Sequence, residues 1–405
     1  MADTEPVQDW ATDYDILDAS YIQDPLPVWE ELRGRCPIAH TDRHEGSFLP
    51  TKYADVQAMA KMLPALSSRD PLVMRAPEII REDARQIKYG ANAAPISSDG
   101  EEQSWTRRIL LPHYTVKAIE AHRRYTVELC NRLIDGFIDH GSADAAGEYA
   151  QQIPPRLIAL KLGVDEDRAE EFTYWVRAVL ELGLSDPDLR VKYRKVIRDF
   201  FHETVEDRMA NPGGDDLVSH FVAARTPEGD PIDPEIIVGM CNLQLVAGID
   251  TTWSSIGSAL WHFATHPEDR RRLAGEPELF PTAVEESLRF YSPVTMAREV
   301  IEDVEYNGVH MSPGDKVIMN FPGANHDPEA FEDADKFIID RKVNRHIAFG
   351  AGIHRCAGSN LARMEMDVAL RTWFERIPEF EVSDPAQVTW AGGQVRGPRY
   401  LPVSF

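Results

Sequence analysis

One cysteine stands in a glycine-rich segment whose residue types suit a thiolate. Cys356 lies in the stretch Phe349-Gly350-Ala351-Gly352-Ile353-His354-Arg355-Cys356-Ala357-Gly358, and a helical pattern opens at Leu361. Backbone N–H groups freed by the glycines and the positive end of the next helix stabilise a thiolate. Glycine also lets the main chain approach a flat, bulky partner where a Cβ atom would collide. A buried cysteine beside a glycine turn is the simpler alternative.

A second candidate lies inside a long apolar helical pattern. Asp233 and Pro234 are typical of a helix start, and the pattern continues to about His266. Its middle reads Ala247-Gly248-Ile249-Asp250-Thr251-Thr252. A carboxylate and hydroxyls are unfavourable there unless they have partners or a purpose. Gly248 weakens the helix and lets another group approach the backbone. Both a water-filled kink and a catalytic site fit this pattern.

These segments resemble the cytochrome P-450 family. The cysteine loop matches the pattern F-G-x-G-x-H-x-C-x-G at every fixed position, and the resemblance implies that the Cys356 thiolate is the axial iron ligand. Four further motifs precede the loop, in the order typical of the family. They begin at Asp99, Ala247, Glu286 and Ala324. The resemblance runs from about residue 20 to the end of the chain.

The resemblance implies haem b (iron protoporphyrin IX) as cofactor and assigns its contacts. Arg107, Arg298 and His354 correspond to the residues that bind the haem propionates. Gln103 stands where the family has histidine, so it can donate a hydrogen bond but brings no charge. The other expected haem contacts come from the central helix and the cysteine loop: Ala247, Gly248, Phe349, Gly350 and Gly358.

The resemblance also implies a reaction, the insertion of one oxygen atom from O2 into a hydrophobic substrate. In the family the central-helix threonine opens a groove for dioxygen, and the acid beside it helps to deliver protons. Thr251 and Asp250 match these positions, with Thr252 as their supporting neighbour. Electrons from NAD(P)H would come through a separate ferredoxin and ferredoxin reductase, since no flavin- or iron–sulfur-binding sequence is fused to the chain.

Two alternatives stay open. One is a peroxide-dependent haem-thiolate peroxygenase, and the other is a non-catalytic haem-binding sensor. Peroxide-using members of the family usually lack the acid–alcohol pair, whereas Asp250 and Thr251 are both present. An intact proton relay also argues against a sensor.

Substrate contacts are expected from apolar residues, which suit a small or medium hydrophobic molecule. The candidate pocket residues are Leu243, Val246, Ala247, Val294, Met296, Gln394 and Val395. The proline-dotted region 69–98 corresponds to the family's substrate lid, and an inward-pointing arginine there could anchor a substrate carboxylate. Its candidates are Arg69, Arg75, Arg81 and Arg85. The alternative for this region is a solvated loop.

Two charged clusters have expected structural or partner roles. Glu286 and Arg289 are three residues apart and share a helix face. The resemblance adds Arg341 and implies a buried ion triad that supports the cysteine loop. Positive residues on the cysteine side are expected to dock an acidic ferredoxin: Arg107, Arg108, Lys117, Arg123, Arg124, Arg345, Arg355 and Arg363.

Composition excludes several other functions and compartments. The net charge of −24 argues against nucleic acid and anionic membranes as partners. The four cysteines are widely separated, with no C-x-x-C pair, which fits a reducing compartment. The sequence shows no signal-peptide pattern and no apolar run of the roughly 18 residues needed for a membrane span. A cytoplasmic protein without a membrane anchor is therefore expected.

The fold that must position these residues is expected to be mainly α with a smaller β-rich part (α+β). The resemblance implies a single domain over residues 1–405, with haem between the long central helix and the cysteine loop. Its β-rich portion would comprise about 20–100 plus the last strands, and its helical portion about 100–370. The local pattern predicts helices from Pro25, Tyr53 and Asp99, the last capped by the Asp99 side chain. Residues 1–20 are expected to be an irregular arm, and 304–309 to pair with 313–317 as a hairpin.

Overall fold

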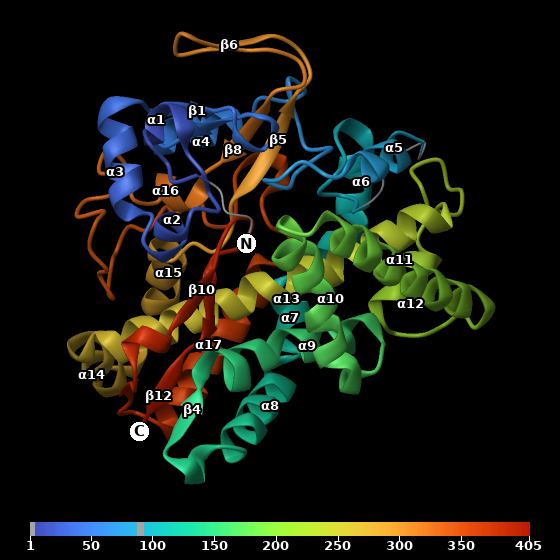
Figure 1. The fold of residues 1–405 in the computed structure, drawn as a ribbon. Coiled ribbons are helices and arrows are strands. Elements are labelled where there is room, and N and C mark those ends of the chain that lie inside the picture. The colour runs from blue at the N-terminus through green and yellow to red at the C-terminus, as the bar shows by residue number, and fades with distance from the viewer. Residues whose placement is uncertain (1–4, 87–92) are drawn as a thin grey trace.

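The computed structural model describes residues 5–86 and 93–405, and it is mainly helical with small sheets (Figure 1). The helices of the first half are α1 (Trp10–Asp13), α2 (Ala19–Gln23), α3 (Leu26–Arg35), α4 (Tyr53–Met59), α5 (Glu78–Gln86), α6 (Gly100–Leu110), α7 (Val116–Glu120), α8 (Arg123–Asp135), α9 (Ile153–Leu162), α10 (Ala169–Leu180) and α11 (Pro187–Ala210). Those of the second half are α12 (Leu217–Ala223), α13 (Pro234–Thr265), α14 (Pro267–Gly275), α15 (Phe280–Phe290), α16 (Phe321–Ala324) and α17 (Ser359–Arg376).

Helix α13 is the central element, and α9, α10, α11 and α17 pack around it (Figure 1). Its start is the predicted one, because the Asp233 side chain accepts a hydrogen bond from the Glu235 N–H at 3.0 Å and Pro234 follows. By length and composition α13 could cross a membrane, which the sequence pattern did not indicate. Yet 72% of its most apolar window is buried inside the protein, as in the core helix of a soluble protein.

The largest sheet has five strands in the order β1-β2-β8-β5-β3, and it lies beside the N-terminal helices (Figure 1). Its strands are β1 (Ile38–Thr41), β2 (Ser47–Pro50), β3 (Leu66–Ser67), β5 (Met296–Val300) and β8 (Lys316–Met319). The N-terminal strands are thus completed by the segment 296–319, and the last strands form no pair with them in the described sheets.

The C-terminal strands pair elsewhere. Strand β12 (Pro402–Ser404) pairs with β4 (Ser142–Asp144) and β9 (Glu381–Val382), while β10 (Thr389–Ala391) pairs with β11 (Gly397–Tyr400). The backbone N–H of Leu401 also donates to the Asp144 carboxylate at 2.9 Å. These contacts fix the end of the chain against the start of the helical region, far from β1.

The predicted hairpin is correct for one strand and wrong for its partner. Strand β6 (Val304–Tyr306) pairs with β7 (Val309–Met311) across Asn307 and Gly308, whose φ values of 49° and 78° suit a tight hairpin turn. The segment at Lys316–Met319 is instead β8. All four of its residues are buried, so it needs a sheet that is covered on both faces.

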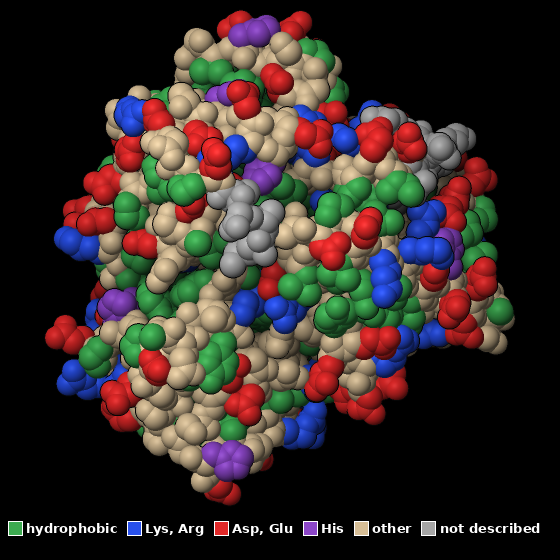
Figure 2. Space-filling model, viewed as in Figure 1, with side chains coloured by type: hydrophobic (Ala, Val, Ile, Leu, Met, Phe, Trp, Pro, Cys, Tyr) green, Lys and Arg blue, Asp and Glu red, His purple; other side chains and the backbone are tan. Residues whose placement is uncertain are grey.

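The start of the chain is folded rather than an irregular arm. Helices α1 and α2 and the residue that caps α1 bury Ala11, Tyr21 and Tyr14, and the Trp29 indole N–H donates to the Tyr21 hydroxyl at 2.9 Å. Widely spaced aromatic residues make these contacts, so no regular hydrophobic period reveals them. Acidic side chains are spread over the visible face, in keeping with the negative net charge (Figure 2).

Candidate active site

The cysteine loop is held in a tight conformation immediately before α17. Gly350 and Gly352 adopt φ values of 73° and 72°, which other residues rarely reach. The Cys356 N–H donates to the Phe349 carbonyl at 2.8 Å and closes the loop. This geometry directs Cys356 towards an internal cavity, whose wall it forms in part.

The cavity has a volume of about 220 Å³ and lies between α13, α6, β5 and the cysteine loop. It brings together most of the residues that the sequence singled out. Those on its wall are Arg107, Leu243, Ala247, Gly248, Thr251, Thr252, Val294, Met296, Arg298, Phe349, Gly350, His354, Cys356 and Gly358.

The surroundings of Cys356 act in opposite directions on the pKa of its thiol. Burial raises the pKa of its thiol, and this effect outweighs the groups that lower the pKa, which are the Gly358 N–H, Arg107, Arg355 and Arg363. A coordinating metal ion deprotonates a thiol outright. The site therefore suits a cysteine whose charge is completed by a bound metal.

Two basic side chains, Arg298 and His354, reach the cavity with nitrogens that make no hydrogen bond to a described residue. Arg298 is 3% exposed, its Nη1 donates only to the Ala297 carbonyl, and its Nε has no partner among the described residues. Burial lowers the pKa of Arg298 to about 10 and also lowers the pKa of His354, whose Nε2 makes no hydrogen bond to a described residue. Such donors fit an anionic group inside the cavity.

Arg107 and Gln103 connect α6 to the cysteine loop. The Arg107 guanidinium donates to the Arg355 carbonyl at 2.5 Å and lies on the cavity wall. Gln103 is absent from the described wall, because its side-chain amide donates to the Ile353 carbonyl at 2.9 Å and is buried there. In the structure Gln103 stabilises the cysteine loop through this hydrogen bond, whereas the sequence predicts direct contact with the cofactor.

Asp99 does not cap α6 through its side chain. Its carboxylate instead accepts hydrogen bonds from the Ser67 hydroxyl and, at 3.2 Å, from the Ser68 N–H. One carboxylate oxygen lies 3.9 Å from His354 Nε2. Asp99 therefore connects β3 with the histidine of the cysteine loop, a contact that local helix signals do not reveal.

Thr251 and Asp250 point in different directions. The Thr251 hydroxyl donates to the Ala247 carbonyl at 2.9 Å and lies on the cavity wall. Asp250 is fully buried, and its Oδ1 accepts hydrogen bonds from Arg399 at 2.9 Å and from Ser254 at 3.2 Å. Burial raises the pKa of Asp250 while Arg399 lowers it, and the net direction is upwards. The expected acid–alcohol pair is therefore not assembled at the cavity in this conformation.

Gly248 serves helix packing as well as the cavity. A Cβ atom at this position would lie 2.5 Å from Ile158 Cδ1 on α9. The sequence predicted that another group approaches this backbone, and the structure identifies α9 as that group.

Three predicted pocket residues are absent from the described cavity wall: Val246, Gln394 and Val395. Val246 packs against the hydrophobic core on another face of α13. The Gln394 amide accepts from the Val73 N–H at 2.8 Å and donates to the Thr295 carbonyl at 2.7 Å. It therefore links the segment at Val73 to the segment at Thr295. Val395 is buried and pairs with Val294, which does face the cavity.

The sequence reasoning missed several wall residues, notably Tyr114 and Gln244. The Tyr114 hydroxyl donates to the Gln244 side chain at 2.6 Å inside the cavity lining. Spacing along α13 could have found Gln244 and Ser255, since both lie on the helix face that carries Thr251. No local signal identifies Tyr114 or Ile158, because other elements bring them to the wall.

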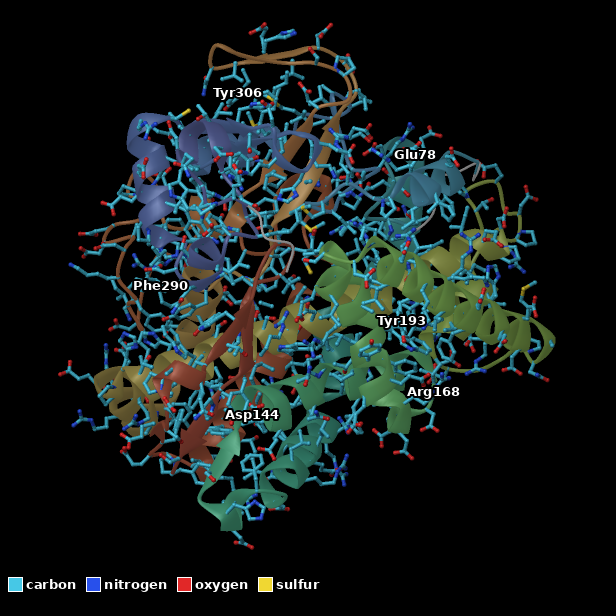
Figure 3. All side chains as sticks on the ribbon, viewed as in Figure 1. Glu78, Asp144, Arg168, Tyr193, Phe290 and Tyr306 are labelled. Atoms are coloured by element: carbon cyan, nitrogen blue, oxygen red, sulfur yellow. The ribbon has the colours of Figure 1, made fainter. Side chains whose placement is uncertain are left out.

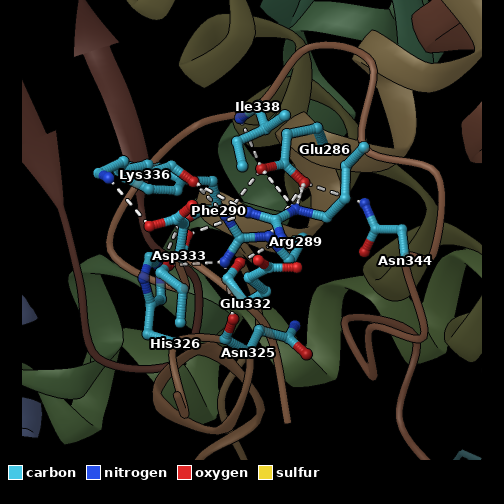
Figure 4. Close-up of polar contacts among 12 residues, drawn as sticks. Glu286, Arg289, Phe290, Asn325, His326, Glu332, Asp333, Lys336, Ile338 and Asn344 are labelled. Atoms are coloured by element: carbon cyan, nitrogen blue, oxygen red, sulfur yellow. Dashed lines mark hydrogen bonds and ion pairs between the residues drawn. The ribbon is translucent and has the colours of Figure 1, made fainter.

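The ion triad lies in a dense polar network (Figure 4). Glu286 and Arg289 are fully buried and lie 2.7 Å apart, and Arg341 Nε lies 3.0 Å from Glu286. The Asn344 side chain and the Ile338 N–H also donate to the Glu286 carboxylate, at 3.0 and 2.9 Å. This buried carboxylate therefore has two cationic partners and two neutral donors, and the loss of Arg289, which is itself fully buried, would remove the closest of its charged partners.

The three arginines of region 69–98 whose side chains are described lie away from the cavity. Arg75 donates to the Gly314 carbonyl at 2.6 Å, Arg81 pairs with Glu45 and Glu78, and Arg69 is exposed. None of these three lines the described cavity. The side chain of Arg85 lies outside the described residues.

The predicted docking patch is smaller than the sequence suggested. Arg123, Arg124 and Arg363 are paired with acidic neighbours, which are Asp367, Glu128 and Glu285 respectively. Within residues 5–86 and 93–405, five of the predicted cations form no ion pair: Arg107, which lies on the cavity wall, and Arg108, Lys117, Arg345 and Arg355. Pairing of i,i+3 and i,i+4 neighbours explains part of the difference.

Comparison with known proteins identifies relatives of one family. A family model described as Cytochrome P450 matches residues 184–389. Mycinamicin IV hydroxylase/epoxidase of Micromonospora griseorubida is 32% identical over 89% of this chain and 89% of that protein. Vitamin D(3) 25-hydroxylase of Pseudonocardia autotrophica is also 32% identical, over 91% of this chain and 90% of its own length.

Solved structures are similar over nearly the whole chain. The cytochrome P450 PksS of Bacillus subtilis 168 superposes with a TM-score of 0.85 at 28% identity, and the match covers 96% of this chain and 99% of that one. CYP109E1 of Bacillus megaterium, solved with testosterone, gives 0.85 at 28% identity over 95% and 98%. With the cysteine loop, the cavity and the relatives in agreement, this chain belongs to the cytochrome P450 family of haem-thiolate monooxygenases.

Proposed function

We propose that haem b binds in the cavity with Cys356 as its axial ligand. The observation that carries this assignment is that Cys356, Arg298 and His354 line one cavity, where Arg298 Nε and His354 Nε2 make no hydrogen bond to a described residue. The propionate groups would accept hydrogen bonds from Arg107, Arg298 and His354. The buried guanidinium of Arg298 would then gain the anionic partner that the polypeptide does not give it.

The bound haem would supply the redox chemistry that activates dioxygen. The protein would position the substrate, exclude water and meter protons. Thr251 would present its hydroxyl to the reacting oxygen, since its side chain is already at the wall. Asp250 would first have to leave Arg399, because its contact with that residue holds it away from Thr251. Thr252 would support the same helix turn.

The substrate we propose is a small or medium hydrophobic organic molecule. Leu243, Val294 and Met296 give the cavity an apolar side, and Gln244 and Tyr114 add a polar contact. Relatives named for mycinamicin IV and vitamin D(3) are consistent with hydrophobic organic substrates.

We propose that electrons come from a separate acidic ferredoxin and its NAD(P)H-dependent reductase. Membership of a bacterial-type P450 family implies a redox partner, and the unpaired cations Arg108, Lys117, Arg345 and Arg355 offer a complementary charge. Residues 1–405 would act as one cytoplasmic domain. Pairing of β12 with β4 and free cysteines throughout the described chain support that assignment.

The test is turnover of purified holoenzyme with hydrophobic candidate substrates chosen by their shift of the haem spin state. We expect a hydroxylated product, with one oxygen atom from labelled O2, only when ferredoxin, reductase and NAD(P)H are all present. Product from hydrogen peroxide at an equal or higher rate would favour the peroxygenase instead. Tight spin-state binding without any turnover would favour a sensor.

A further inference from the structure

A second cavity lies behind the backbone that walls the first. It has a volume of about 480 Å³ and is bounded by α2, α3, the ends of α13 and α15, and residues 382–396. Ser292 lines this second cavity, whereas the next two residues, Pro293 and Val294, line the cavity of Cys356. The Arg396 N–H donates to the Pro293 carbonyl at 2.7 Å and closes the wall between them. The two linings share no described residue, so the cavities are separate sites.

Aromatic rings dominate the lining. Three of the chain's eight tryptophans line the cavity, namely Trp29, Trp261 and Trp390. Trp261 packs edge-to-face on Trp390 at 5.3 Å between ring centroids and on Tyr291 at 5.8 Å. Phe290 adds a further ring from the end of α15 (Figure 3). Figure 2 shows hydrophobic side chains in a recess at the left of the molecule, below the N-terminal helices.

The size and rigidity of this cavity suit a small molecule. Ligand pockets typically measure about 300–1,000 Å³ and are lined by apolar and aromatic side chains with a few polar groups. The rings come from separate segments and lie edge-to-face, so their open faces are fixed before any ligand arrives. A planar aromatic molecule would make the best use of such faces.

One cation supplies the polar group. Arg396 stacks on Trp390, with its guanidinium carbon 4.4 Å from the ring centroid. Its Nε and Nη2 donate to the carbonyls of Ile22 and Gln23, both at 2.7 Å, and Nη1 makes no hydrogen bond to a described residue. Burial lowers the pKa of Arg396 to about 10, and the charge that most opposes this shift is that of Asp24.

Asp24 does not neutralise the site. It lies on the exposed rim of the cavity and forms no ion pair with Arg396 in the described part of the chain. Solvent screens its charge. The cavity thus combines fixed aromatic faces with a half-buried positive charge that forms no ion pair in the described part of the chain.

We propose that this cavity binds a planar aromatic carboxylate, with its rings against Trp261 and Trp390 and its carboxylate on Arg396. The ligand would be distinct from the substrate oxidised at Cys356. Binding would quench the fluorescence of the lining tryptophans without altering the haem ligand.

The test titrates naphthoate into purified holoenzyme whose first cavity is saturated with phenylimidazole, as judged by the Soret band. Equilibrium dialysis counts bound naphthoate, and tryptophan fluorescence reports its position. We expect one equivalent to bind, with quenching, while the Soret band stays unchanged. We expect the neutral analogue naphthylmethanol to bind about tenfold more weakly, the effect of losing roughly one charge-assisted contact.

Two variants and a control locate the site. Val388→Phe fills the half-buried rim of the cavity and Arg396→Gln removes the cation, and each should weaken naphthoate binding by about tenfold or more. Val127→Phe, on the exposed face of α8, should leave binding unchanged. If Arg396→Gln fails to fold, Val388→Phe and the neutral analogue still test whether naphthoate binds in this cavity. Loss of naphthoate binding on phenylimidazole addition, equal binding of the neutral analogue, or full affinity in Val388→Phe would each overturn the proposal.

Discussion

The carboxylate of Asp250 lies 2.9 Å from the guanidinium of Arg399, and this contact turns it away from the cavity that Thr251 faces. Arg399 in turn lies 2.8 Å from Glu181, which also pairs with Arg177. The acid expected to deliver protons is therefore the inner end of a charged chain that leads towards the surface. If Asp250 delivers protons as we propose, it must exchange Arg399 for Thr251.

Removing the charge at Asp250 should slow proton delivery and leave substrate binding intact. In Asp250→Asn we expect the turnover number to fall by about 10²-fold, the usual contribution of one positioned proton donor. The solvent deuterium isotope effect on turnover should rise. Asp199→Asn, an exposed residue of α11, serves as the control and should behave as wild type. An unchanged turnover number and isotope effect in Asp250→Asn would contradict the role of this carboxylate.

Thr251 should control how much consumed oxygen reaches the product. Thr251→Ala removes the hydroxyl at the cavity wall, so we expect product per NAD(P)H to fall by at least about tenfold while hydrogen peroxide rises. Thr265→Ala changes the same residue type at the far end of α13 and should keep the wild-type ratio. Measuring oxygen, peroxide and product together decides the matter, and full coupling in Thr251→Ala would argue against the assignment.

Motifs with fixed spacing gave reliable predictions, and long-range partners did not. The bounds of α13, the cysteine loop and the triad follow from local residue types at Asp233, Gly350 and Glu286. Nothing near Asp250 in sequence reveals Arg399, which lies 149 residues away. The hydrogen bonds that hold Gln103 and Gln394 off the described cavity wall were hidden for the same reason, since backbone carbonyls of distant segments accept from their amides.

The sheet partners also depended on distant segments. Strand β8 is buried on both faces and joins the N-terminal strands, although its sequence neighbour β7 turns back on β6. Strand propensity predicts that such segments are extended, but it does not choose between partners of similar apolar character.

Glu285 should make stability depend on pH. Burial raises its pKa, but hydrogen bonds from Arg363 on α17 and from His346 outweigh this and lower the pKa to about 2. The stabilisation is therefore complete above pH 4.5, the unfolded value, and is lost as the pH falls towards 2. Because the side chain is partly exposed, we expect about 1–3 kcal/mol at pH 7.

The measurement for Glu285 is urea unfolding of Glu285→Gln and wild type at pH 7 and pH 3. The variant should be less stable at pH 7, and the difference should shrink at pH 3. Glu278→Gln, at an exposed position shortly before α15, is the matched control and should match wild type at both values. A constant difference across this range would show that Glu285 does not carry the pH dependence.

Charge reversal on the docking patch should slow reduction by ferredoxin alone. Arg108 and Arg355 form no ion pair with described residues, so Arg108→Glu or Arg355→Glu removes attraction without freeing an acidic partner. We expect reduction by ferredoxin to slow by about tenfold or more at low salt and less at high salt, with dithionite reduction unchanged. Arg271→Glu on α14 is the control. Equal ferredoxin rates in all proteins would place the docking surface elsewhere.

The most direct test of the central claim is the absorption spectrum of the dithionite-reduced protein with carbon monoxide. If Cys356 is the axial thiolate ligand, the Soret band should be strongly red-shifted, and Cys356→His should move it to the position typical of imidazole-ligated haem. An imidazole-like band in the wild type, or no haem spectrum after expression with ample haem, would contradict the account.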